Sequence, residues 1–188
     1  MSVFRTHKEK QLWFYVIIIL VGIFSVLAIG RPLQEMLRDQ NTQAVFFLIG
    51  MLLTAATIVI HGLKVRPGKV EWVIWLGLAA VYTMFIFRLG APERSHVIEY
   101  SVLAVFILSA LIERQGEKGK YLRPGLIAFV LTTLIGTIDE GIQVFLPDRV
   151  FDPQDILFNS LAALMAVGGS ILLRYVRHKF SRSHQISE

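Results

Sequence analysis

The chain has 188 residues, of which 54% are hydrophobic and 18% are charged. Soluble globular domains carry about 25% charged residues, so this composition excludes an ordinary soluble domain. The absence of cysteine excludes disulfides, thiolate metal sites and a cysteine nucleophile. The formal net charge of +5 does not indicate a nucleic-acid partner, because the basic residues lie at the ends of apolar segments, where they orient a membrane protein.

The apolar residues are gathered in blocks of about 18–24 residues, the length that a helix needs to cross a hydrocarbon layer of ~30 Å. Six blocks are expected to span the membrane, at residues 12–30, 44–63, 70–89, 96–113, 124–146 and 155–175. They predict an all-α fold, a polytopic transmembrane helix bundle that forms one domain over residues 12–175.

The segments outside these blocks are polar. The N-terminal segment, residues 1–11, is basic, and the block after it is longer than the apolar region of a signal peptide, so we expect it to be retained. Pro32 lies at the start of a polar connection, residues 31–43, and is expected to mark the end of the first helix. Residues 176–188 form a polar tail that we expect to be frayed.

The distribution of Lys and Arg predicts how the spans are oriented. One side receives the N-terminal segment, the 64–69 turn, the 113–123 loop and the C-terminal tail with Arg174 just before it, which together hold 14 of the 19 basic residues. The other side holds five, namely Arg31, Arg38, Arg88, Arg94 and Arg149. Because basic residues gather on the cytoplasmic side, both termini are predicted to be cytoplasmic.

Residues 136–159 join the fifth and sixth blocks and carry five acidic residues. Ionisable groups at membrane depth are costly and are functional-site candidates for that reason. Asp139 lies about 15 residues into the fifth block, roughly 22 Å from its cytoplasmic start at 1.5 Å per residue. Asp139 and the adjacent Glu140 are therefore expected in the outer leaflet.

Polar stripes on three helices are predicted to meet at this outer surface. Residues three or four apart share one face of a helix, and hiding polar faces from lipid requires that they turn towards one another. The predicted site consists of His96, Glu99 and Tyr100 from the fourth block, Asp139, Glu140 and Gln143 from the fifth, Arg149 from the connection, and Asp152, Asp155 and Asn159 at the start of the sixth.

Several of these residues also have a purely structural interpretation. Asp152 is placed to be the N-cap of the sixth helix, with Asp155 in its first turn. Gln143 and Asn159 could join helices through hydrogen bonds. Tyr100 could be an aromatic residue of the membrane interface.

The remaining members suggest acid–base chemistry. His96 beside carboxylates can act as a general acid or base, with Glu99, Asp139 and Glu140 as its partners. Arg149 is the nearest cation in the sequence and could anchor an anion or form a structural pair with a carboxylate. The same carboxylates and histidine could bind a divalent metal, but the chain has no His-Glu-x-x-His pattern, so we predict no metal and identify no cofactor.

Four short motifs occur together over about residues 40–175. They are His96-Val97-Ile98-Glu99-Tyr100, Asp139-Glu140-x-x-Gln143, Pro147-x-Arg149 and Asp155-x-x-x-Asn159. As a set they resemble the VanZ-like family of bacterial membrane proteins, whose namesake is associated with low-level resistance to the lipoglycopeptide teicoplanin. The resemblance implies a helical protein of the bacterial inner or plasma membrane. Family members often have Gly where this chain has Asp148.

Three functions are compatible with these residues. The first is binding or sequestration of a cell-envelope amphiphile, such as a lipoglycopeptide or a lipid-linked precursor, at the outer leaflet. The second is a membrane enzyme, a hydrolase or transferase, that acts on a lipid-linked envelope substrate. The third is a proton- or cation-coupled transporter. The predicted charges argue against a transporter, because they gather on one side of the bundle. The lipid bilayer is the expected environment in each case.

Overall fold

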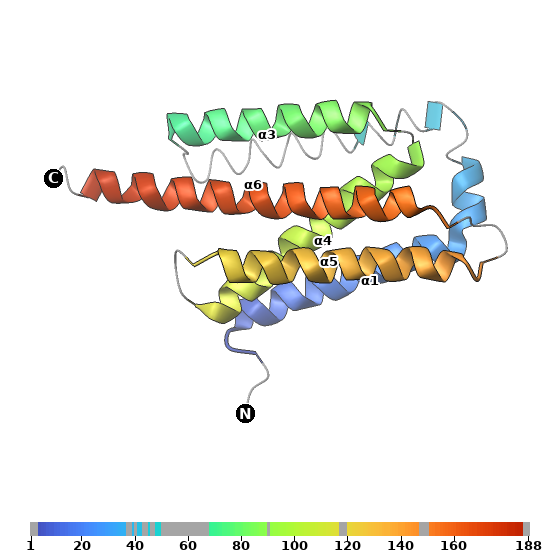
Figure 1. Cartoon of the computed structure of the whole chain (residues 1–188), viewed down its shortest axis with the longest axis horizontal. Coiled ribbons are helices and arrows are strands. Elements are labelled where there is room, and N and C mark those ends of the chain that lie inside the picture. The colour runs from blue at the N-terminus through green and yellow to red at the C-terminus, as the bar shows by residue number, and fades with distance from the viewer. Residues whose placement is uncertain are drawn as a thin grey trace.

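The computed structural model describes residues 4–36, 39, 41–42, 45, 48–49, 68–89, 91–116, 120–146 and 151–185. These parts of the chain form five helices and no strand (Figure 1). The helices are α1 (His7–Met36), α3 (Lys69–Phe87), α4 (Ala91–Gln115), α5 (Leu122–Gln143) and α6 (Pro153–Gln185). The predicted all-α fold is confirmed for the described ranges.

Four helical segments are long and apolar enough to cross a membrane, namely Lys69–Phe87, Arg94–Gln115, Leu122–Gln143 and Pro153–Lys179. By length and composition the chain is therefore a multi-pass membrane protein. These segments correspond to the last four expected spans. The first expected span lies inside α1, and its crossing of the membrane stays a prediction. Most of the second, residues 44–63, lies outside the described residues.

Two predicted helix ends are wrong. The first helix does not stop before Pro32 but continues to Met36, as proline is tolerated within membrane helices. The polar tail is not frayed from its start, because α6 continues to Gln185 with no Gly or Pro after Gly169 to interrupt it. In addition, α1 begins within the N-terminal segment. Thr6 caps it there, since its Oγ1 accepts the backbone N–H of Glu9 at 3.0 Å.

Helices α4 and α6 occupy the centre of the bundle. They pack against each other and both pack against α5, whereas α1 lies along α4 and α3 lies along α6 (Figure 1). The buried face of α4 repeats every three or four residues, as expected for a helix with one packed side. It comprises Val97, Tyr100, Leu103, Ala104, Ile107 and Leu108. Small residues of α6, Ala162 and Ala163, are fully buried in the same apolar cluster.

Most of the outward-facing surface of α3 is apolar. Val73, Leu76, Met84 and Phe87 are all more than half exposed. A soluble protein would not leave such a continuous apolar helix uncovered, whereas lipid tails cover it at no cost. The exposed surface is therefore compatible with a bilayer.

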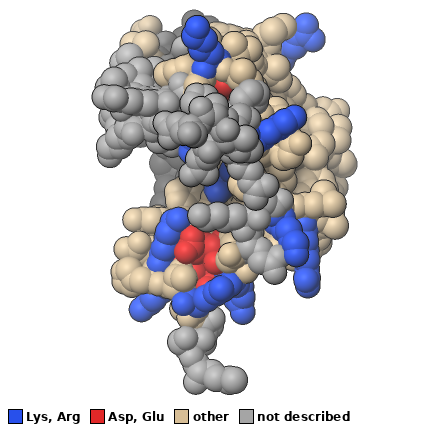
Figure 2. Space-filling view, turned by 90° about the vertical axis from the view of Figure 1, so that its left-hand side faces the viewer, with Lys and Arg blue, Asp and Glu red and all other residues tan. Residues whose placement is uncertain are grey.

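Ion pairs tie the start of α1 to the last turn of α4. Lys8 Nζ lies 3.1 Å from Glu113 Oε2, and Arg114 Nη1 lies 3.6 Å from the buried Glu9 Oε1. Arg5 Nη1 also donates to the carbonyl oxygen of Arg114 at 3.2 Å. Figure 2 faces this end of the bundle and shows Lys and Arg side chains around an acidic group.

A second contact joins the start of α3 to the far part of α6. Arg177 forms an ion pair with Glu71, and its Nε donates to Glu71 Oε1 at 3.0 Å. The C-terminal part of α6 and the α4–α5 connection lie at the same end of the molecule (Figure 1). The described parts of the segments predicted to be cytoplasmic therefore lie at one end, and which side of a membrane that end faces stays a prediction.

Candidate functional site

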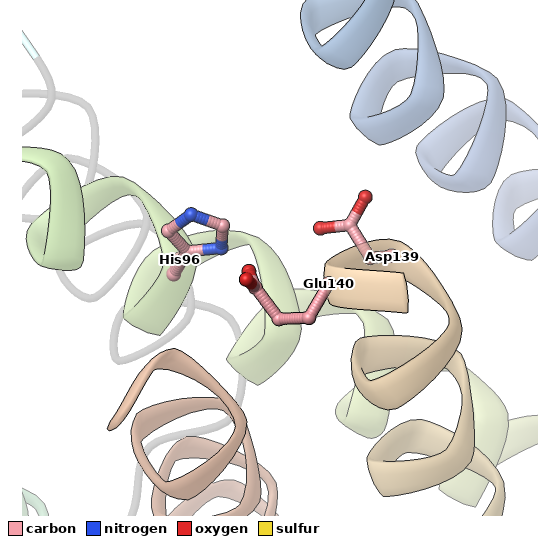
Figure 3. Close-up of side chains that lie close together, drawn as sticks. All are labelled: His96, Asp139 and Glu140. Atoms are coloured by element: carbon pink, nitrogen blue, oxygen red, sulfur yellow. The ribbon is translucent and has the colours of Figure 1, made fainter. Parts of the chain in front are cut away.

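Three acid–base side chains converge at the other end of the bundle. His96 lies in the second turn of α4, and Asp139 and Glu140 lie in the last turns of α5 (Figure 3). One potential ligand atom from each of the three lies within 4.8 Å of the others. Asp139 is 2% exposed and Glu140 is 0% exposed. Two adjacent acidic residues of α5 are therefore buried beside a histidine.

Tyr100 positions Asp139. Its hydroxyl donates to Asp139 Oδ2 at 2.9 Å, and its ring stacks on His96 with centroids 6.2 Å apart. Tyr100 is 0% exposed, so the alternative interpretation as an interfacial aromatic is wrong. Glu99, which shares this helix face, is partly buried and lies within electrostatic range of Asp139.

Glu140 links the end of α5 to the start of α6. Gln143 Nε2 donates to Glu140 Oε1 at 2.7 Å, three residues along the same helix. The backbone N–H of Asp152 approaches Glu140 Oε2 at 3.4 Å. Gln143 was also considered as a residue that joins two helices through a hydrogen bond. Its hydrogen bond in the structure instead stays within α5 and orients the carboxylate of Glu140.

Asn159 lies one helical layer deeper and is fully buried. Neither of its amide atoms has a hydrogen-bond partner among the described residues. It packs against Gly136, where an added Cβ would lie 3.0 Å from Asn159 Cβ and 3.3 Å from Tyr100 Cε1. Gly136 was not among the predicted site residues, yet its lack of a side chain allows α4, α5 and α6 to meet. The available signal was its position three and four residues before the two acids, on the same helix face.

Asp152 and Asp155 begin α6. Asp152 Oδ1 accepts the backbone N–H of Gln154 at 2.8 Å, which is the contact of an N-cap residue. Pro153 takes the first helical position, where its missing N–H costs nothing. Asp155 is in the first turn, where a negative charge is favourable near the helix N-terminus. The structural role weighed for Asp152 is therefore present.

Asp152→Ala is expected to destabilise the protein by about 1 kcal/mol, because the first turn of α6 loses its cap. Asp152→Asn should stay within a few tenths of a kcal/mol of the wild type, because Asn caps equally well. Unfolding of the three proteins in the same detergent measures this difference. Equal stability of the Ala and Asn variants would contradict the capping role. Loss of function in an Asp152→Asn variant of unchanged stability would indicate a role for the charge.

The remaining predicted site residue, Arg149, lies outside the described residues. A cavity of about 1120 Å³ lies at the opposite end of the bundle, where α4 connects to α5. Its lining combines apolar and basic side chains, including Leu111, Arg114, Lys120, Arg123, Ile171 and Tyr175. It contains none of the predicted site residues and does not bear on their chemistry.

The geometry brings nine predicted residues to one end of the bundle and joins several of them directly. No protein-family model, curated protein or solved structure matches the chain. A histidine beside two buried carboxylates can transfer protons, bind a cation, or hydrogen-bond a polar ligand.

Proposed function

We propose that the chain is a VanZ-like protein of a bacterial cell membrane that binds a cell-envelope amphiphile at the outer leaflet. The observation that carries the proposal is the polar site at one end of the bundle, with the basic segments at the other. If the basic end is cytoplasmic, as the positive-inside rule predicts, the site faces outward. The motifs shared with the VanZ-like family provide the residues of that site.

An amphiphile needs a polar contact beside an apolar one. The polar contact would come from His96 and from the carboxylates of Asp139 and Glu140. The apolar contact would come from exposed side chains next to them, since Val144 is 60% exposed and Phe145 is 85% exposed just after α5. An acyl chain could then lie along α5 in the lipid while its sugar or peptide head reaches the site.

A lipoglycopeptide or a lipid-linked envelope precursor fits this description. Both carry a long apolar chain and a large polar head rich in hydrogen-bonding groups. Binding such a molecule at the outer leaflet would lower its free concentration where it acts. This is the link we propose to teicoplanin-type resistance.

A membrane enzyme is the second candidate, and the approach of His96 to Glu140 favours it. In Figure 3 the Glu140 carboxylate turns towards the imidazole. A histidine held close to carboxylates can accept a proton from a nucleophile and return it to a leaving group. A hydrolase or transferase acting on a lipid-linked substrate would use the same pair.

Glu140→Gln tests the proposed function. The change keeps the volume, and the new amide oxygen can still accept the bond from Gln143, but the charge is removed. In a teicoplanin-sensitive host we expect the wild-type protein to lower susceptibility, and Glu140→Gln to lose this effect at unchanged membrane abundance. Glu113→Gln is the matched control, because this carboxylate lies at the opposite end of the bundle and should keep the effect.

Two outcomes would contradict the proposal. If the wild type leaves susceptibility unchanged at confirmed abundance, the link to lipoglycopeptides fails. If Glu140→Gln keeps the full effect, this carboxylate is not part of the working site. A collapse of abundance in Glu140→Gln alone would show that the acid supports the fold.

A further inference from the structure

We infer that His96, Asp139 and Glu140 bind one divalent transition-metal ion of the zinc type, against the expectation of no metal drawn from the missing His-Glu-x-x-His pattern. The inference concerns the same polar site as the proposed function and rests on that site being a working one. It can fail separately, because metal binding is measured on purified protein and resistance is measured in cells. The three side chains come from two helices that pack against each other, α4 and α5.

The donor set fits such an ion. Zinc in proteins binds histidine nitrogen at about 2.0–2.1 Å and carboxylate oxygen at about 2.0–2.2 Å. These bond lengths place neighbouring ligand atoms about 3.4 Å apart in a tetrahedral site. The three atoms already lie within 4.8 Å of one another. Small side-chain rotations would close the remaining gap without moving either helix.

One nitrogen of the His96 imidazole is available to bind a ligand. His96 Nδ1 is buried and has no hydrogen-bond partner among the described residues. A buried polar atom normally has a partner, and a metal ion is one explanation for an atom that has none. The ring itself is held by stacking on Tyr100.

The burial of Glu140 points the same way. This residue is fully buried, and its described hydrogen bonds come from neutral groups, the amide of Gln143 and the backbone N–H of Asp152. Burying an ionised carboxylate is costly unless a positive charge compensates it, above all within a membrane span. A divalent cation shared with Asp139 would compensate both acids.

Two neighbours would support the ligands from outside. Tyr100 holds one oxygen of Asp139, and Gln143 holds one oxygen of Glu140. Metal-binding carboxylates are usually oriented by such hydrogen bonds, whose loss typically weakens metal binding 10–100-fold. Three protein ligands also leave a coordination position for water or for a polar group of the amphiphile.

The experiment uses the full chain, purified in detergent without a histidine tag and stripped with a chelator. The protein is then titrated with Zn²⁺ against a competing dye, and bound metal is counted by mass spectrometry after dialysis. We expect one Zn²⁺ per chain for the wild type. His96→Gln and Glu140→Gln should lose it, and Tyr100→Phe, a positioning variant, should bind about 10–100-fold more weakly. His178→Gln, at the other end of the bundle, should bind as the wild type does.

Each contrary result overturns the inference. Absence of Zn²⁺ from the wild type does so directly, whatever the variants do. Zn²⁺ that persists in both His96→Gln and Glu140→Gln would be an adventitious ion only. Binding of Mg²⁺ or Ca²⁺ in preference to Zn²⁺ would exclude a transition-metal site.

A measurement on the wild type alone guards against variants that do not fold. Co²⁺ loaded in place of Zn²⁺ should give visible absorption bands of a nitrogen–oxygen site, and Zn²⁺ should abolish them. The rival source of positive charge is Arg149. If the wild type binds no metal and Arg149→Gln collapses in abundance, the arginine compensates the acids and the metal inference is wrong.

Discussion

Gly136→Leu is expected to destabilise the bundle by about 1–3 kcal/mol, because a side chain at this position has no space to occupy. Even a Cβ would lie 3.0 Å from Asn159 Cβ and 3.1 Å from its Nδ2, and Leu adds three further carbons. The substitution should also separate α5 from α6 and displace Tyr100, so the proposed function should be lost with the stability. Thermal unfolding in one detergent, together with the susceptibility assay, measures both effects.

Gly141→Leu provides the matched control. Gly141 lies five residues further along the same helix, and nothing lies within 4 Å of a Cβ placed there. Leu has a higher helix propensity than Gly by about 1 kcal/mol, so this variant should be as stable as the wild type or more so. Because the propensity gain is the same at both positions, the difference between the two variants isolates the packing of Gly136. Equal stability would show that the three helices do not meet as described.

The meeting of three polar stripes could be predicted from spacing alone. His96 and Tyr100 are four residues apart, as are Asp139 and Gln143, and Asp155 and Asn159, and a helix places such residues on one face. Apolar blocks of spanning length then fix which helix ends lie together. The predicted neighbourhood of His96, Asp139 and Glu140 follows from these two regularities, and the structure brings the three together.

The details that sequence spacing missed depend on contacts between distant parts of the chain. Nothing local to Arg5 indicates that it contacts a carbonyl 109 residues away. The close approach at Gly136 likewise depends on Asn159 and Tyr100, which lie in other helices. The position of Pro32 predicted a helix end, because proline disfavours a helical conformation in the residue before it. The helix continues past Pro32 because a membrane favours segments whose backbone hydrogen bonds are made within the helix.

Tyr100→Phe should cost about 1.5–3 kcal/mol of stability, the usual contribution of a hydrogen bond to a charged group. The variant keeps the ring and its stacking on His96 and removes only the hydroxyl that donates to Asp139 at 2.9 Å. Since Asp139 is 2% exposed, water cannot readily replace the lost donor. Unfolding is measured in the presence of a chelator, so that the loss reports the hydrogen bond and not a bound metal.

Tyr82→Phe is the control that separates this bond from the general loss of a tyrosine hydroxyl. The Tyr82 hydroxyl lies 3.4 Å from Ser101 Oγ in a partly buried position, so its contact is long and involves a neutral partner. Its removal should cost less than about 1 kcal/mol. If the two variants lose equal stability, the Tyr100–Asp139 hydrogen bond contributes no more to stability than the Tyr82 contact, and the site is held by packing alone. If Tyr100→Phe is the more costly, the hydroxyl fixes Asp139 in place, and its stability loss and its weaker metal binding have one cause.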